Sequence, residues 1–216
     1  MISIFPISNG SQIISNEDFV EKILPALSEY FPLNNDDVLV VSSLAISLAQ
    51  GNVVSYKNLT EKNAIIEGES KRIIRSRPDI KISETIHGFI CEDAGVQKKY
   101  KSDNELVLLP IDIDKAAHSV RLGLKNQTGY DCPVIVSGNF HRPFRLGEVG
   151  VALGISGLNA LNENGITCDS IASAAELTMD YSNNIYCTLV RGMPISYKGN
   201  SKGKDIIRPI IEELFL

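Results

Sequence analysis

The chain has 216 residues, of which 44% are hydrophobic and 22% charged, a composition typical of a globular protein rather than a disordered one. Its formal net charge of −5 argues against a nucleic acid polymer as partner, because proteins that bind one usually present concentrated basic surface. No segment approaches the ~20 apolar residues of a membrane span, and the start of the chain lacks signal-peptide character, so we expect a cytoplasmic protein with no membrane partner.

The N-terminal region predicts a strand followed by a helix. The strand covers Ile2–Phe5 and is expected to end at Pro6. Ser15 and Asp18 have the spacing of a capping box, and the apolar residues after them recur with helical periodicity over 19–30.

The next segments predict the start of the central sheet. Val38–Val41 is a continuous apolar run, typical of a strand that is buried on both faces. The alternating residues of Asn52–Lys57 are expected to continue the same sheet. Glu67–Arg77 is interpreted as a basic helix that Pro78 stops.

The remainder alternates irregularly between strands and helices, which indicates a mixed α/β (α+β) fold. We expect one domain over residues 1–216, which could be arranged as two lobes. The expected strands are Thr85–Cys91, Leu106–Leu109, Pro133–Val136 and Ile185–Val190, and the expected helices are Asp114–Asn126, with Gly129 as its C-terminal stop, and Ile171–Met179. The last residues form a basic turn and a short apolar end that is expected to dock on the body or on a partner.

Four cysteines, Cys91, Cys132, Cys168 and Cys187, are far apart and include no Cys-x-x-Cys pair. Each lies in or beside an apolar stretch. This pattern predicts reduced, buried thiols.

The segment from Val134 to Leu158 is the most informative for function, since an apolar strand passes there into a turn dense in charge. His141 could bind an anion or transfer a proton. Arg142 and Arg145 flank a stiffening proline, and their guanidinium groups suit phosphate or carboxylate. The alternative is that these arginines form ion pairs with Glu148, with Asp169 or with the C-terminal acids.

Standard catalytic signatures are absent from the sequence. It contains no phosphate-binding P-loop, no Gly-x-Gly-x-x-Gly turn and no Gly-x-Ser-x-Gly elbow. The glycines of Gly154–Gly157 are interpreted as sites of close backbone packing. A divalent metal would need several carboxylates, and Glu92, Asp93 and Glu148 are the candidates, with a solvated polar loop as the alternative.

A series of motifs in a fixed order resembles the coenzyme F-420:L-glutamate ligases (F-420-0 gamma-glutamyl ligases). Phe140–Arg145, for instance, resembles their Phe-Gly-Arg-Pro-Trp/Phe-Arg segment. The other matching segments are Phe5–Ile7, Asp36–Ser42, His87–Gly88 with Ala94–Val96, Leu108–Pro110 with Asp112 and Asp114, Val151–Leu158, Asp169–Met179, Val190–Gly192, and Ile207–Pro209 with Glu212–Phe215.

The resemblance implies an enzyme that uses GTP and divalent metal, Mn²⁺ or Mg²⁺, to activate a carboxylate that the amine of L-glutamate then attacks. It implies an intertwined homodimer with the site near the subunit junction. Candidate residues follow by role: Phe5, Pro6, Ile7, Ser42 and Ser43 for cofactor binding, His141, Arg142 and Arg145 for catalysis, and Glu92, Asp93 and Glu148 for metal.

The chain departs from the family pattern where that chemistry is carried out. Glycines replace two acids, leucines replace two lysines, and other polar positions change as well. The altered positions are Leu44, Leu48, Gln50, Gln97, Tyr100, Gly138, Glu148, Val149, Gly150, Asp180 and Tyr181. These losses favour a diverged protein without the usual metal and GTP site, which binds a small anionic ligand or L-glutamate or regulates a partner.

Two alternatives remain open. One is an active GTP- and metal-dependent ligase that adds L-glutamate to a deazaflavin, a folate-like or a related acceptor. The other is a different reaction on the same scaffold.

Overall fold

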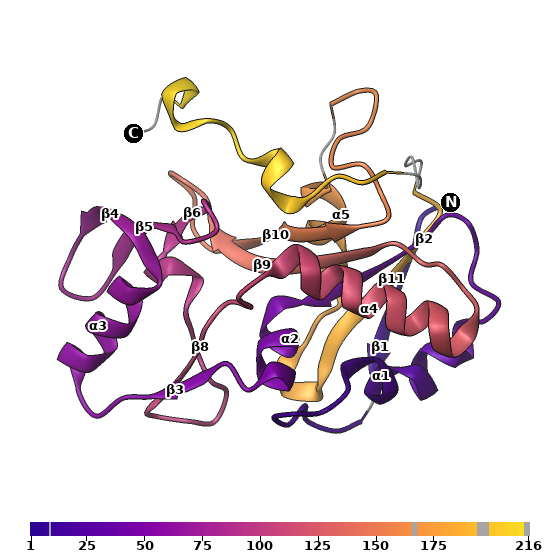
Figure 1. The fold of residues 1–216 in the computed structure, drawn as a ribbon, viewed down its shortest axis with the longest axis horizontal. Helices are drawn as coiled ribbons and strands as arrows, with labels where there is room; N and C mark the ends of the chain where they lie inside the picture. The colour runs from indigo at the N-terminus through magenta and orange to yellow at the C-terminus, as the bar shows by residue number, and fades with distance from the viewer. Residues whose placement is uncertain (9, 166–167, 194–198, 214–216) are drawn as a thin grey trace.

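A computed structural model describes residues 1–8, 10–165, 168–193 and 199–213, and it has the expected α+β architecture (Figure 1). The strands are β1 Ser3–Ser8, β2 Asp37–Ser42, β3 Val53–Ser55, β4 Ser70–Ser76, β5 Lys81–Thr85, β6 Ile90–Glu92, β7 Gln97–Lys98, β8 Glu105–Val107, β9 Val134–His141, β10 Glu148–Ser156 and β11 Ile185–Arg191. The α-helices are α1 Phe19–Leu27, α2 Ser43–Gln50, α3 Leu59–Gly68, α4 Ile113–Thr128 and α5 Asp169–Glu176, and short 3-10 helices cover Ser28–Tyr30, Asp93–Gly95, Tyr181–Asn183, Gly203–Ile206 and Ile210–Glu212.

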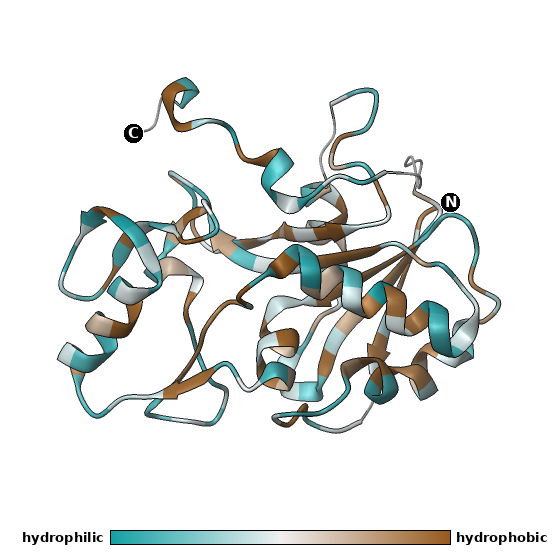
Figure 2. Ribbon diagram, viewed as in Figure 1, coloured by the Kyte–Doolittle hydropathy of each residue, from teal (hydrophilic) through white to brown (hydrophobic). Residues whose placement is uncertain are grey.

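A five-stranded sheet in the order β1-β11-β2-β9-β10 forms the centre of the molecule. Only β2 and β9 run parallel; the other neighbours are antiparallel. Because side chains alternate along a strand, Leu39 and Val41 face the core under α1, α2 and α4, whereas Val38 and Val40 face the core under α5. The sheet strands are accordingly rich in apolar residues (Figure 2). The prediction that 38–41 is buried on both faces is confirmed.

A smaller lobe, residues 53–107, lies beside this sheet and holds two three-stranded sheets, β3-β8-β7 and β4-β5-β6 (Figure 1). The prediction that 52–57 continues the central sheet is therefore wrong. The predicted helix over 67–77 is also wrong, since α3 ends at Gly68 and β4 follows. Ile73 and Ile74 are β-branched, and such residues favour strands over helices. Strand β5 supplies the antiparallel partner for this stretch.

Two boundaries near the N-terminus differ from expectation. Strand β1 continues through Pro6, because β1 is an edge strand and the missing N–H faces no neighbour. The cap of α1 is Asp18 itself, whose carboxylate accepts from the N–H groups of Val20 and Glu21, and not a capping box that starts at Ser15. The helical region ends as predicted at Tyr30, but its last residues are a 3-10 turn.

The later elements agree better with expectation. Helix α4 ends at Gly129 in a left-handed conformation, as predicted. The expected strand 85–91 is only partly confirmed, since Thr85 ends β5 and Ile90 begins β6, with a tight turn over 86–89 between them. Gly154 confirms the close-packing interpretation, since a Cβ there would collide with the carbonyl of Ile113 at the start of α4.

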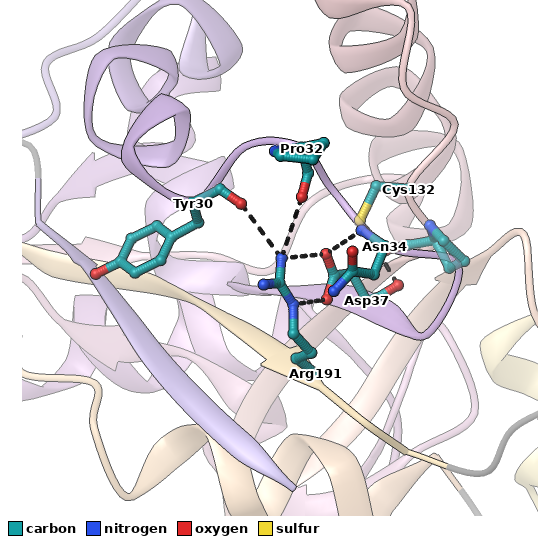
Figure 3. A network of polar contacts seen from close by, with 7 residues as sticks. Tyr30, Pro32, Asn34, Asp37, Cys132 and Arg191 are labelled. Carbon is teal, nitrogen blue, oxygen red and sulfur yellow. Dashed lines mark hydrogen bonds and ion pairs between the residues drawn. The ribbon is translucent and has the colours of Figure 1, made fainter. Parts of the chain in front are cut away.

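A buried ion pair joins the outer ends of β2 and β11 (Figure 3). Nε and Nη2 of Arg191 donate to the two carboxylate oxygens of Asp37, at 2.6 and 2.8 Å, and the Asp37 side chain is fully buried. The same guanidinium donates to the carbonyl of Tyr30 at 3.2 Å, and Asn34 N–H donates to Asp37 at 2.7 Å. The hydrogen bonds with Asp37 raise the pKa of Arg191. Arg191, which lies in one of the segments that resemble the family, is thus engaged in an ion pair within the chain.

The C-terminal segment, residues 199–213, crosses the molecule above β10 and ends near the small lobe (Figure 1). Its final apolar residues, 214–216, lie outside the described part of the chain, so the expected docking of the apolar end concerns residues that the structure does not describe. None of the helices among the described residues is long and apolar enough to cross a membrane.

Candidate functional site

The β9–β10 hairpin brings three predicted site residues together with the small lobe. His141 and Glu148 are cross-strand partners, so their side chains lie on one face. Nδ1 of His141 is 2.9 Å from a carboxylate oxygen of Glu92, on β6, and 3.6 Å from one of Glu148. This cluster therefore links the small lobe to the central sheet through one imidazole and two carboxylates.

The carboxylate of Asp93 makes contacts different from those of Glu92. Its carboxylate accepts from the N–H of Lys81 at 2.9 Å and lies 3.8 Å from Nζ of Lys62, both in the small lobe. Within the described ranges, no three His, Cys, Asp or Glu side chains are arranged so that they could hold a metal ion. The predicted trio is split between two environments, since Glu92 and Glu148 lie at His141 and Asp93 lies in the small lobe.

Arg142 and Arg145 lie in the turn between β9 and β10 and are exposed. Neither side chain forms an ion pair or hydrogen bond with another described residue, so the alternative of a pair with Glu148 does not hold there. Phe144 and Leu146, in the same turn, are 94% and 103% exposed. The turn presents two cations and two apolar side chains to solvent.

The predicted cofactor residues occupy the sheet. Phe5, Pro6 and Ile7 pair with β11 in β1, and Phe5 packs on Tyr30 with ring centroids 5.0 Å apart. Ser42 and Ser43 are buried where β2 passes into α2. The structure thus places all five within regular elements. Ser42 and Ser43 lie where β2 enters α2, whereas the ring of Phe5 lies 5.8 Å from Arg191, toward the other end of the sheet.

Glu176, at the end of α5, was missed by the sequence reasoning. Its carboxylate accepts from the hydroxyl of Ser137 at 2.9 Å. The amide nitrogen of Asn139, turned toward α5, donates to both carboxylate oxygens at 3.1 and 3.2 Å. Burial raises the pKa of Glu176, the negative charge of Glu148 adds to this, and the hydrogen bonds from Ser137 and Asn139 oppose it. A lone acid within the alanine-rich segment IASAAEL was the available signal.

Glu176 also fills the space beside Gly150. A Cβ at residue 150 would collide with Cγ of Glu176 and would lie 2.7 Å from the carbonyl oxygen of Ala172. The acid that the resemblance expects on β10 is therefore absent from the strand, and a carboxylate from α5 occupies its place.

Tyr181 extends this polar cluster to the start of α2. Its hydroxyl accepts from Ser42 at 3.1 Å, and its ring stacks on Tyr186 with centroids 5.8 Å apart. Burial raises the pKa of Tyr181 well above its usual range, and the nearby charge of Glu176 adds to the rise. We name Ser42, Ser137, Asn139, Glu176 and Tyr181 the polar cluster; it offers acceptors and hydroxyls and no cation of its own.

Of the two replaced lysine positions, Leu44 is buried and Leu48 is partly buried. Leu44 is 7% exposed, and Leu48 packs against the core beneath α2. A Cβ at Gly138 would collide with the side chain of Leu153. Among these three positions, the side chains of Leu44 and Leu48 are apolar, and the space beside Gly138 is filled by Leu153.

Comparison with known proteins places these features in context. The family model described as F420-0:Gamma-glutamyl ligase matches residues 9–192. The coenzyme F420:L-glutamate ligase of Methanococcus maripaludis strain S2 is 30% identical, with 94% of this chain and 93% of that protein covered. The corresponding ligases of Methanothermobacter thermautotrophicus and Methanocaldococcus jannaschii are 30% and 28% identical, each with more than nine tenths of both chains covered.

Proposed function

Because the chain belongs to the F420-0:gamma-glutamyl ligase family, we propose that it is a diverged member that binds an amino acid such as L-glutamate and does not perform GTP- and metal-dependent ligation. One observation carries the proposal: positions where the resemblance expects charged groups are filled by packed apolar side chains, at Leu44, Leu48 and beside Gly138. A packed position cannot bind phosphate without rearrangement, since protein interiors tolerate little change in volume.

The proposed ligand class follows from the charges that remain. Glu148 and Glu176 present acceptors suited to an ammonium group, and Arg142 and Arg145 present guanidinium groups suited to carboxylates. All four come from the β9–β10 hairpin and the adjoining end of α5. A compact ligand with one ammonium and two carboxylates matches this set.

The test is isothermal titration of the full chain with L-glutamate, and separately with GTP in the presence and absence of Mn²⁺. We expect heat with L-glutamate, weaker binding after Arg142→Ala/Arg145→Ala, and no metal-dependent heat with GTP. Arg75→Ala is the matched control, because Arg75 is exposed on β4, away from the hairpin. Micromolar GTP binding that requires Mn²⁺ would overturn the proposal.

The second candidate is an active ligase that joins L-glutamate to coenzyme F420, as the names of the relatives state, or to another deazaflavin or folate-like acceptor. The convergence of Glu92 and Glu148 on His141 favours it, since these side chains could rearrange about a cation. Mass spectrometry of reactions with GTP, Mn²⁺, L-glutamate and either F420-0 or a folate-like acceptor tests it, because only a ligase adds the mass of a glutamyl group to an acceptor. Light scattering tests the homodimer that we also propose.

A further inference from the structure

A pocket of about 560 Å³ lies apart from the polar cluster, between the small lobe, the β9–β10 hairpin and the C-terminal segment. The turn from His87 to Ile90 forms one wall, Phe140 and Val151 form the floor, and residues 204–213 form the opposite wall. Its volume is in the range of small-molecule sites in proteins.

The walls of this pocket are mainly apolar. The rings of Phe89 and Phe140 meet edge to face, with centroids 6.2 Å apart. Val151, Ile206 and Ile207 complete the apolar lining. A ligand would gain most by burying an aromatic ring or a compact aliphatic group against these side chains.

The charged groups at the pocket are unequally engaged. Glu84 is held by Lys71 at 2.7 Å and by Arg72 at 2.6 Å, and Asp169 accepts from the N–H of Ala152 at 2.9 Å. Lys204 and Arg208, in contrast, have no ion pair or side-chain hydrogen bond with any residue in the described part of the chain. The pocket therefore offers two cations without an ion pair among the described residues, beside the carboxylates of Glu84, Asp169 and Glu213.

The position of these cations is fixed by the way the C-terminal segment is attached. Gly203 is buried against the carbonyl of Leu153, where a Cβ could not fit, and its N–H donates to the carboxylate of Asp114 at 2.8 Å. The same oxygen of Asp114 accepts from the N–H of Ile155 at 2.9 Å. The segment is thus tied to β10 and α4 immediately before Lys204.

We propose that this pocket binds a compact apolar or aromatic molecule that carries one carboxylate or phosphate group. The apolar part lies between Phe89, Phe140 and Ile207, and the anion lies at the rim with Lys204 and Arg208. The site is separate from the amino-acid site proposed above and does not depend on it.

The experiment uses amide chemical shifts of the full chain, labelled with ¹⁵N, because they locate the ligand. The probes are phenyl phosphate and benzoate, which join a ring to an anion, and inorganic phosphate and benzyl alcohol, which each carry one half. We expect saturable shifts at the amides of Gly88, Phe140, Val151 and Ile207 with the first two probes. Inorganic phosphate and benzyl alcohol should bind at least about tenfold more weakly.

The double variant Lys204→Ala/Arg208→Ala should weaken phenyl phosphate about tenfold or more, since charge-assisted hydrogen bonds are lost. Lys202→Ala/Arg77→Ala is the control: it removes the same charge from exposed positions outside the pocket. All four side chains are exposed, so neither variant threatens the fold.

Three results would overturn the proposal: shifts confined to the β9–β10 turn, equal loss of affinity in both double variants, or no saturable shift at pocket amides. None of these results requires L-glutamate or GTP, so failure here is distinct from failure of the proposed function.

Discussion

Removal of the Arg191 guanidinium should destabilise the fold through Asp37. Arg191→Met leaves the fully buried Asp37 carboxylate with the N–H of Asn34 as its remaining partner among the contacts described. Removing one partner of a buried pair costs about 3–5 kcal/mol. The Arg191 side chain is 25% exposed, which screens the pair, so we expect the lower end of that range, about 3 kcal/mol.

Urea unfolding, followed by circular dichroism, measures this cost. With a slope of about 2 kcal/mol per molar urea, the midpoint should fall by ~1.5 M. Asp37→Asn should also destabilise, and the double variant should cost less than the sum of the single variants, because it leaves no unpaired charge. Arg75→Met is the control, with an expected change within ~0.5 kcal/mol.

Additive costs in the double variant would refute the reasoning, since they would show that the two groups do not interact energetically. A midpoint within ~0.3 M of the wild type for Arg191→Met would refute it as well, because it would mean that the buried carboxylate needs no counter-charge.

Three further predictions concern Glu176, Gly150 and the thiols. Because the pKa of Glu176 is raised in the folded protein, the folded state holds this proton to higher pH than the unfolded state does. The unfolding free energy of the wild type, relative to Glu176→Gln, should therefore fall as pH rises above the ordinary pKa of 4.5. An equal pH dependence of the two proteins in urea unfolding from pH 4 to 8 would contradict this. Gly150→Ala should cost about 1–3 kcal/mol in thermal or urea unfolding by overpacking, whereas the control Gly68→Ala, with open space around it, should cost nothing; equal effects would count against the packing argument. Burial raises the pKa of Cys91, Cys132 and Cys168 to about 12 and raises that of the buried Cys187 too, so Ellman's reagent should react only after unfolding, and a thiol that reacts within minutes in native buffer would show otherwise.

Local patterns were sufficient where an element's own residues decide its structure. The apolar run before Ser42 predicted a fully buried strand, and the amphipathic pattern that ends at Gly129 predicted α4, because burial and capping depend on sequence spacing alone. The same holds for the family, whose motifs run in order along the chain and match over residues 9–192. The buried cysteines were predicted correctly for the same reason.

Segments whose structure depends on a distant partner were not predictable in this way. Residues 70–76 form a strand because β5 is available to pair with them, although their basic character resembled a helix. Neighbouring Glu92 and Asp93 were expected to bind the same metal ion. The carboxylate of Glu92 instead contacts His141, and that of Asp93 accepts from the N–H of Lys81 in the small lobe.

The sequence alone determined four of the five central strands, the C-terminal stop of α4 and the family, since these follow from periodicity and motif spacing. The tertiary structure alone decided that Glu176 fills the space beside Gly150, that Asp37 neutralises Arg191, and that Lys204 and Arg208 lie at a pocket with no ion pair to a described residue. Each of these depends on contacts between residues far apart in the chain, and such contacts are set by packing in three dimensions rather than by any local pattern.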